Sequence, residues 1–97
     1  ELLKTMDAHD CRNIVFSSSA TVYGEPEYLP LGENHSIEPV NSYGSSKMAV
    51  ENILKDWARE GRSACVLRYF SPVGAHPSGR IGEDPHGIPN NLMPYIA

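Results

Sequence analysis

The sequence predicts an α/β fold in which two parallel strands are joined by a crossover helix. Apolar runs at residues 13–18 and 64–67 suit buried strands, and helical periodicity lies between them at residues 42–60. Alternation of strand, helix and strand implies a parallel sheet, and ligands of such sheets bind beyond the carboxyl ends of the strands. We therefore expect residues 17–23 and 69–73, which follow the two strands, to face one crevice.

The chain opens with a short predicted helix at residues 2–9, where leucine and methionine recur at helical spacing. The run from residue 13 to residue 18 that follows is rich in β-branched and aromatic side chains, as expected of a buried strand. Residues 24–41 form a long connection punctuated by proline and glycine.

The helix predicted at residues 42–60 has the strongest periodic signal in the chain. Asn41 or Ser42 can cap its start, because both side chains accept hydrogen bonds from free helix amides. Glu51 and Lys55 are predicted to form a favourable ion pair on the outer face. The apolar stripe that we expect to face the sheet consists of Val50, Ile53, Leu54, Trp57 and Ala58.

Gly61 is predicted to end this helix. The apolar run at residues 64–67 is typical of a strand that is covered on both faces, which places Cys65 in the core. Residues 71–90 are rich in proline and glycine, and loops of that length without structure of their own are commonly functional. Residues 92–97 are interpreted as the start of another helix.

Composition excludes several classes of function. The net charge is -4 and no basic stripe is present, which argues against nucleic acid as a partner. No apolar run approaches the roughly 20 residues that span a bilayer, so no membrane association is expected. Two cysteines do not make a disulfide framework and favour a reduced, cytosolic setting. No metal site is expected from the scattered histidines, which are His9, His35, His76 and His86.

Tyr43 and Lys47 lie four residues apart on the predicted helix and so share its inner face. A lysine on a buried stripe is costly unless its charge is used, and a nearby ammonium favours the phenolate form of a tyrosine. Tyr43 is therefore a candidate general base or acid. The spacing by itself is weak, because five tyrosines make a chance match common and Lys47 can also extend to solvent.

Hydroxyl side chains crowd the end of the first predicted strand, where the crevice is expected. Ser19 can hydrogen-bond a substrate hydroxyl or carbonyl and align it with Tyr43. The alternative is that these hydroxyls satisfy only local backbone groups, and for Ser17 and Ser18 we favour that alternative.

Residues 17–24 (SSSATVYG) and residues 43–47 (YGSSK) together resemble the extended short-chain dehydrogenase/reductase superfamily. Residues 67–79 (LRYFSPVGAHPSG) and residues 81–95 (IGEDPHGIPNNLMPY) are more specific and resemble the UDP-glucose 4-epimerase (UDP-galactose 4-epimerase) family within it. The resemblance covers nearly the whole chain.

The resemblance implies a partial Rossmann-like, doubly wound parallel sheet. Residues 1–70 would be the C-terminal half of an NAD-binding domain, and residues 71–97 the start of a sugar-nucleotide-binding region. The implied function is interconversion of UDP-glucose and UDP-galactose by epimerisation at C4, through a 4-keto intermediate with tightly bound NAD, in galactose metabolism. The whole protein would be a cytoplasmic homodimer. Both ends of this chain look cut, so we expect the chain to be an internal piece of that protein.

The resemblance also implies roles for single residues. Ser19, Tyr43 and Lys47 would be catalytic: Tyr43 as phenolate takes the proton of the hexose 4-hydroxyl while NAD takes the C4 hydride. Lys47 would bind the nicotinamide ribose, and Ser19 the reacting oxygen. The implied cofactor-binding residues are Ser19, Tyr43, Lys47, Tyr69, Phe70 and Pro72. The implied substrate-binding residues are Ser19, Thr21, Tyr43, Ser71, Asn91 and Leu92.

Two residues depart from the family pattern. Ser71 stands where the family usually has Asn, which puts substrate affinity in question, and Ser42 stands where Pro is common. The glycine-rich turn that cradles the cofactor pyrophosphate is absent from residues 1–97. We therefore expect the chain alone neither to bind NAD tightly nor to turn over.

Two other readings stay open. A related nucleotide-sugar epimerase or dehydratase is one, although a dehydratase needs an acidic pair where Ala20 and Thr21 stand. A non-catalytic domain that keeps the fold for binding is the other, and the joint presence of Ser19, Tyr43 and Lys47 counts against it.

Overall fold

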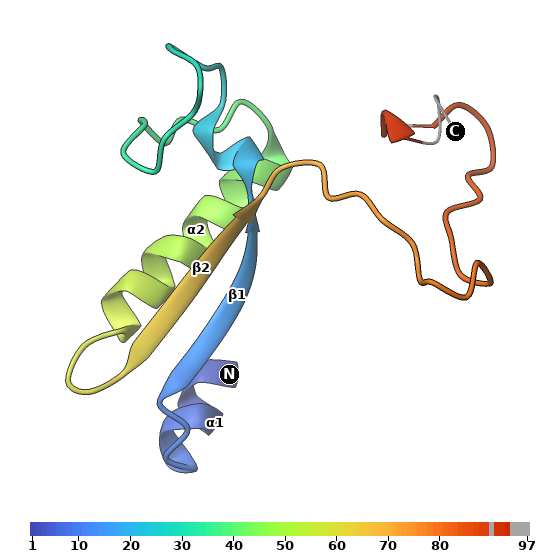
Figure 1. The fold of residues 1–97 in the computed structure, drawn as a ribbon. Coiled ribbons are helices and arrows are strands. Elements are labelled where there is room, and N and C mark those ends of the chain that lie inside the picture. The colour runs from blue at the N-terminus through green and yellow to red at the C-terminus, as the bar shows by residue number, and fades with distance from the viewer. Residues whose placement is uncertain (90, 94–97) are drawn as a thin grey trace.

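The computed structural model describes residues 1–89 and 91–93, and it forms a small α/β unit followed by a long segment that leaves it (Figure 1). The predicted helix at residues 92–97 and the motif residues Asn90, Pro94 and Tyr95 lie largely outside the described residues. In chain order the elements are helix α1 (Leu2–Ala8), strand β1 (Asn13–Ser19), the 3₁₀-helix η1 (Ala20–Tyr23), helix α2 (Ser42–Trp57) and strand β2 (Ser63–Tyr69).

The two strands pair in parallel, which confirms the predicted α/β fold with a crossover helix. Their register runs from Asn13 opposite Ser63 to Ser19 opposite Tyr69. Both strands therefore end at one edge of the sheet, and Figure 1 shows their arrowheads side by side there. The predicted juxtaposition is confirmed for the strand ends, because Tyr23, Tyr69 and Phe70 border one hollow. It is wrong for residues 71–73, which border another.

Helix α2 begins where the sequence predicts. The Asn41 side chain caps it by accepting a hydrogen bond of 2.8 Å from the Gly44 amide, so Asn41 and not Ser42 is the cap. The helix ends at Trp57, earlier than expected, and Gly61 lies in the turn that follows with φ of 83°. That left-handed backbone suits glycine, which has no Cβ to clash.

The buried side of α2 is rotated from the predicted stripe. Leu54 and Trp57 are buried as expected, but Ile53 is 55% exposed. Glu51 takes its place on the inner side and is 8% exposed. The predicted ion pair between Glu51 and Lys55 on the outer face is therefore wrong: Glu51 points at the sheet, where Arg68 is its partner.

Helix α2 covers one face of the sheet, and within the described residues the other face stays open. Alternate side chains of a strand point to opposite faces. Val15 of β1 and Leu67 of β2 therefore lie on the open face and are 68% and 39% exposed. Cys65 lies on that face too and is exposed, so its predicted place in a core covered on both sides is wrong for this part of the chain.

The core sits between α2, η1 and the sheet and includes Val22, Tyr23, Leu54 and Trp57. Helix α1 is tied to the far end of α2, because the Trp57 indole donates a hydrogen bond of 3.1 Å to Asp7. None of the helices described in residues 1–89 and 91–93 has the length and apolar character that a membrane crossing requires.

Candidate active site

Ser19 closes β1 and starts η1 at the carboxyl edge of the sheet. Its hydroxyl oxygen accepts hydrogen bonds from the Thr21 amide (3.2 Å) and the Thr21 hydroxyl (2.9 Å). Because a hydroxyl also carries one donor hydrogen, Ser19 can still donate outward. Tyr69 is its register partner on β2, so the ends of both strands contribute a polar side chain to this edge.

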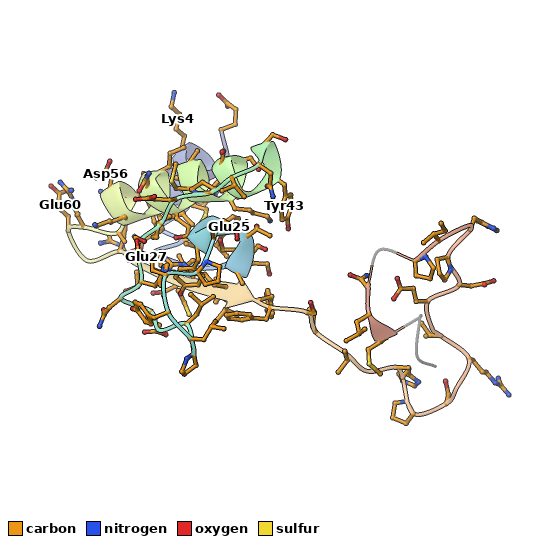
Figure 2. All side chains as sticks on the ribbon, turned by 90° about the horizontal axis from the view of Figure 1, so that it is seen from above. Lys4, Glu25, Glu27, Tyr43, Asp56 and Glu60 are labelled. Atoms are coloured by element: carbon orange, nitrogen blue, oxygen red, sulfur yellow. The ribbon has the colours of Figure 1, made fainter. Side chains whose placement is uncertain are left out.

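Close packing against η1 brings the first turn of α2 to the same edge. A Cβ built on Gly44 would lie 2.7 Å from the Thr21 carbonyl oxygen and 2.9 Å from the Cβ of Pro39. Glycine is therefore required for this approach. The close approach of Gly44 to η1 brings the neighbouring Tyr43 beside the end of β1. Figure 2 shows Tyr43 at the opposite end of α2 from Asp56.

Lys47 connects the helix to the strand. Its Nζ donates a hydrogen bond of 2.9 Å to the Ser17 carbonyl oxygen. The same atom lies 5.1 Å from the Phe16 ring centroid and 5.5 Å from the Tyr43 ring centroid. An ammonium over a ring face is attracted by the ring quadrupole. The charge of Lys47 is thus used, as the sequence predicts, although Tyr43 is 54% exposed rather than buried.

This donor set suits the hydroxyls of a ribose or a hexose. An ammonium has three N–H donors, and the Ser17 carbonyl takes one from Lys47. Tyr43 is 54% exposed near this edge, and Ser19 has a donor hydrogen left there. These residues fit the ribose and nicotinamide end of a dinucleotide. A phosphate cradle at the start of α2 does not fit, because the Asn41 side chain already uses the Gly44 amide there.

A buried polar cluster behind the edge is the feature that sequence reasoning missed. Ser18 was expected to serve local backbone, but its hydroxyl donates to a Glu51 carboxylate oxygen. Arg68 binds the same carboxylate through Nη2 at 2.7 Å and Nε at 3.1 Å, and its Nη1 donates to the Tyr23 hydroxyl at 3.0 Å. The signal available in the sequence was the place of Glu51 one turn after Lys47, on the inner side of the helix.

The pKa values of this cluster follow from its contacts. Burial raises the pKa of Glu51, but the hydrogen bonds from Arg68 and Ser18 and the charge of Arg68 outweigh burial and hold that pKa below its usual value. The hydrogen bond to Glu51 raises the pKa of Arg68 although burial lowers it. Both side chains are therefore charged at neutral pH.

The remaining predicted site residues are divided between two hollows. Tyr69 and Phe70 border one of about 660 Å³, together with Tyr23 and Arg68. Phe70 also borders a second hollow of about 610 Å³, whose other predicted residues are Ser71, Pro72, Asn91 and Leu92. The structure thus brings Ser19, Thr21, Tyr43, Lys47 and Tyr69 to one edge. It places the other four in the segment after β2, with Phe70 between the two groups.

Comparison with known proteins defines the class. The model of the NAD dependent epimerase/dehydratase family matches residues 1–97. The chain is 57% identical to a UDP-glucose 4-epimerase of Mus musculus and 55% identical to that of Bacillus subtilis, with 100% and 99% of this chain covered. The chain therefore belongs to the NAD dependent epimerase/dehydratase family.

Solved structures agree with this assignment. A UDP-glucose 4-epimerase from Bifidobacterium longum in complex with NAD+ and UDP is 51% identical, with a TM-score of 0.84 over 98% of this chain. One from Stenotrophomonas maltophila with bound NAD and formylated UDP-arabinopyranose is 48% identical, with a TM-score of 0.86 over 98%. The chain spans about 29% of the length of these structures and of the two curated relatives.

Proposed function

We propose that this chain is part of an NAD-dependent enzyme that interconverts UDP-glucose and UDP-galactose at C4 through a 4-keto intermediate, in cytoplasmic galactose metabolism. The observation that carries the proposal is Lys47, whose Nζ lies between the Ser17 carbonyl and the Tyr43 ring at the strand edge beside Ser19. Identity of 55–57% to curated UDP-glucose 4-epimerases over 99–100% of the chain supports the same reaction.

In this proposal Tyr43, Lys47 and Ser19 are the catalytic residues. Tyr43 takes the proton from the hexose 4-hydroxyl and later returns it, because its exposed hydroxyl can reach a bound sugar. Lys47 donates to ribose hydroxyls with the N–H groups that the Ser17 carbonyl leaves free, and its ammonium lies 5.5 Å from the Tyr43 ring centroid. Ser19 donates its free hydrogen to the reacting oxygen. NAD, when bound, would supply the acceptor and donor of the C4 hydride, beside the oxygen that Ser19 and Tyr43 contact.

The other predicted residues complete the proposal. Tyr69, Phe70 and Pro72 contact the nicotinamide end of NAD, and residues 1–70 belong to its domain. Residues 71–97 begin the substrate region, which supplies the substrate-binding residues Ser71, Asn91 and Leu92. The other substrate-binding residues, Ser19, Thr21 and Tyr43, lie at the strand edge in residues 1–70. Ser71 is shorter than the usual Asn, and water can bridge the difference. The whole protein acts as a homodimer.

Replacing Tyr43 by Phe tests the proposal in the full-length protein that we expect to contain this chain. The change removes the proton-transferring hydroxyl and keeps the ring over which Lys47 lies. We expect the rate of UDP-galactose conversion to fall by about 10²- to 10⁴-fold, with bound NAD retained. Tyr28→Phe is the matched control, because Tyr28 is 51% exposed and lies in the connection between η1 and α2, away from the proposed catalytic residues. Unchanged turnover of Tyr43→Phe contradicts the proposal.

A further inference from the structure

The polar cluster behind the strand edge has no place among the roles proposed above. We name it the Glu51 cluster and define it as Ser18, Tyr23, Glu51 and Arg68. It takes one residue from each of β1, η1, α2 and β2. Glu51 is 8% exposed, and Ser18 and Tyr23 are 4% exposed. A charge that is withdrawn from water to this extent needs a partner and a reason to be kept.

The contacts of Glu51 fix its position closely. Arg68 reaches both carboxylate oxygens, with Nη2 at 2.7 Å from Oε2 and Nε at 3.1 Å from Oε1, and Ser18 donates to Oε1 as well. A two-pronged pair of this kind sets both distance and angle. The remaining Nη1 of Arg68 holds the Tyr23 hydroxyl at 3.0 Å, and its Cζ lies 4.9 Å from the Tyr23 ring centroid.

The cluster lies one residue behind the proposed catalytic edge on both strands. Ser18 and Arg68 are register partners, and the next pair along the strands is Ser19 and Tyr69. Glu51 therefore binds both residues of the last cross-strand pair, Ser18 and Arg68, before the proposed catalytic edge. Any shift of Ser18 is passed to Ser19 through one peptide unit, which is planar and stiff.

Helix α2 is hydrogen-bonded to two consecutive residues of β1. Lys47 binds the carbonyl of Ser17, and Glu51, one turn later, binds the hydroxyl of Ser18. Both contacts hold the first turns of the helix at a fixed height along the strand. Since Lys47 lies 5.5 Å from the Tyr43 ring centroid, the same contacts set the place of Tyr43.

A buried ion pair is often no more stabilising than apolar side chains of the same volume, so stability alone does not account for the cluster. Catalysis is more demanding, since a misplacement of about 1 Å can cost about 10²-fold in rate. We propose, building on the proposed function, that Glu51 and Arg68 are positioning residues that hold Ser19, Lys47 and Tyr43 in their reactive arrangement.

The test uses the full-length NAD-loaded protein with the variants Glu51→Gln and Ser18→Ala. Glu51→Gln keeps the shape of the side chain and removes its charge. We expect kcat per folded, NAD-loaded molecule to fall about 10- to 100-fold, while KM for UDP-galactose stays within about threefold. Ser18→Ala removes a single contact and lowers kcat by about threefold or more. Asp56→Asn is the matched control, because Asp56 lies on the same helix and its exposed carboxylate pairs with Arg59.

A double variant separates positioning from a general loss of stability. If Ser18 and Glu51 act through one contact, Ser18→Ala adds little to the fall in kcat already caused by Glu51→Gln. Unchanged kcat per folded molecule in Glu51→Gln, or a rise in KM alone, overturns the inference. If Glu51→Gln does not fold, Ser18→Ala decides, and unchanged kcat there overturns it equally.

The same assays distinguish this inference from the proposed function. If the unmodified protein turns over, Tyr43→Phe does not and Glu51→Gln keeps full turnover, the positioning role alone is refuted. Absence of epimerase turnover in the unmodified protein refutes the proposed function and the positioning role together.

Discussion

The α/β unit, residues 1–69, contains buried side chains, whereas the terminal segment, residues 70–89 and 91–93, contains none among its described residues. The unit buries charge, since Glu51 is 8% exposed against Arg68. The terminal segment exposes apolar side chains, with Ile88 at 82% and Leu92 at 68%. In Figure 1 this segment runs away from the sheet in orange and red.

The difference lies in how far along the chain the contacts reach. In the unit, Lys47 bonds to Ser17 and Arg68 to Tyr23, so distant parts of the chain hold one another. In the terminal segment the described hydrogen bonds are local, such as that from the Gly79 amide to the His76 carbonyl. The part of the proposed site at the strand edge is therefore held by contacts between distant parts of the chain, and the part in residues 70–89 and 91–93 is held by local hydrogen bonds among the described residues.

The largest expected contrast comes from removing an aliphatic side chain in each region. Leu54→Ala leaves a cavity in the core, where Leu54 is 2% exposed, and we expect it to lower the free energy of opening at the β1 amides by about 3 kcal/mol. Ile88→Ala, at 82% exposure, should change it by less than about 0.5 kcal/mol. Native-state hydrogen exchange measures both, and similar effects would remove the distinction between the regions.

The next contrast concerns carboxylates and depends on pH. At neutral pH Glu51→Gln should lower the free energy of opening at the β1 amides by about 2 kcal/mol, because hydrogen bonds to a charged group are lost. Since the pKa of Glu51 is lowered in the folded chain, its stabilisation is present above the ordinary carboxyl pKa of about 4.3 and is lost as the pH falls below it.

The difference between Glu51→Gln and the unmodified protein should therefore shrink in acid. Glu83→Gln is the matched control in the terminal segment, where Glu83 accepts a hydrogen bond of 3.3 Å from exposed Asn91. We expect no measurable effect of that change on the β1 amides at any pH. A pH-independent effect of Glu51→Gln would show that its charge is not what stabilises the unit.

The smallest contrast is between two asparagines. Asn41→Ala removes the cap of α2 and should lower the stability of the helix by about 1 kcal/mol. The Gly44 amide, which donates to the Asn41 side chain, should then exchange faster. Asn91→Ala removes an exposed contact in the terminal segment and should leave that amide unchanged. Equal exchange of the Gly44 amide in Asn41→Ala and the unmodified protein would contradict the assigned cap.

Much of the fold was predictable because its signals are local. A cap at Asn41 or Ser42, the periodicity of α2 and the apolar runs of both strands each depend on neighbouring residues, and the order of these elements implied the parallel sheet. The 3₁₀-helix η1 was not predicted, because four residues (Ala20–Tyr23) are too few to show a period. Cys65 was misplaced because an apolar run does not tell which faces of a strand are covered.

For the site, the shared face of Tyr43 and Lys47 and the nearness of Ser19 followed from the sequence by itself, since helical spacing and parallel strand ends set them. Only the tertiary structure decided that Glu51 turns inward. From sequence alone a carboxylate is expected at the surface unless its partner is known, and the partner of Glu51, Arg68, lies 17 residues away on another element. The same is true of the Lys47 contact to the Ser17 carbonyl, 30 residues distant, because a backbone acceptor has no sequence signature.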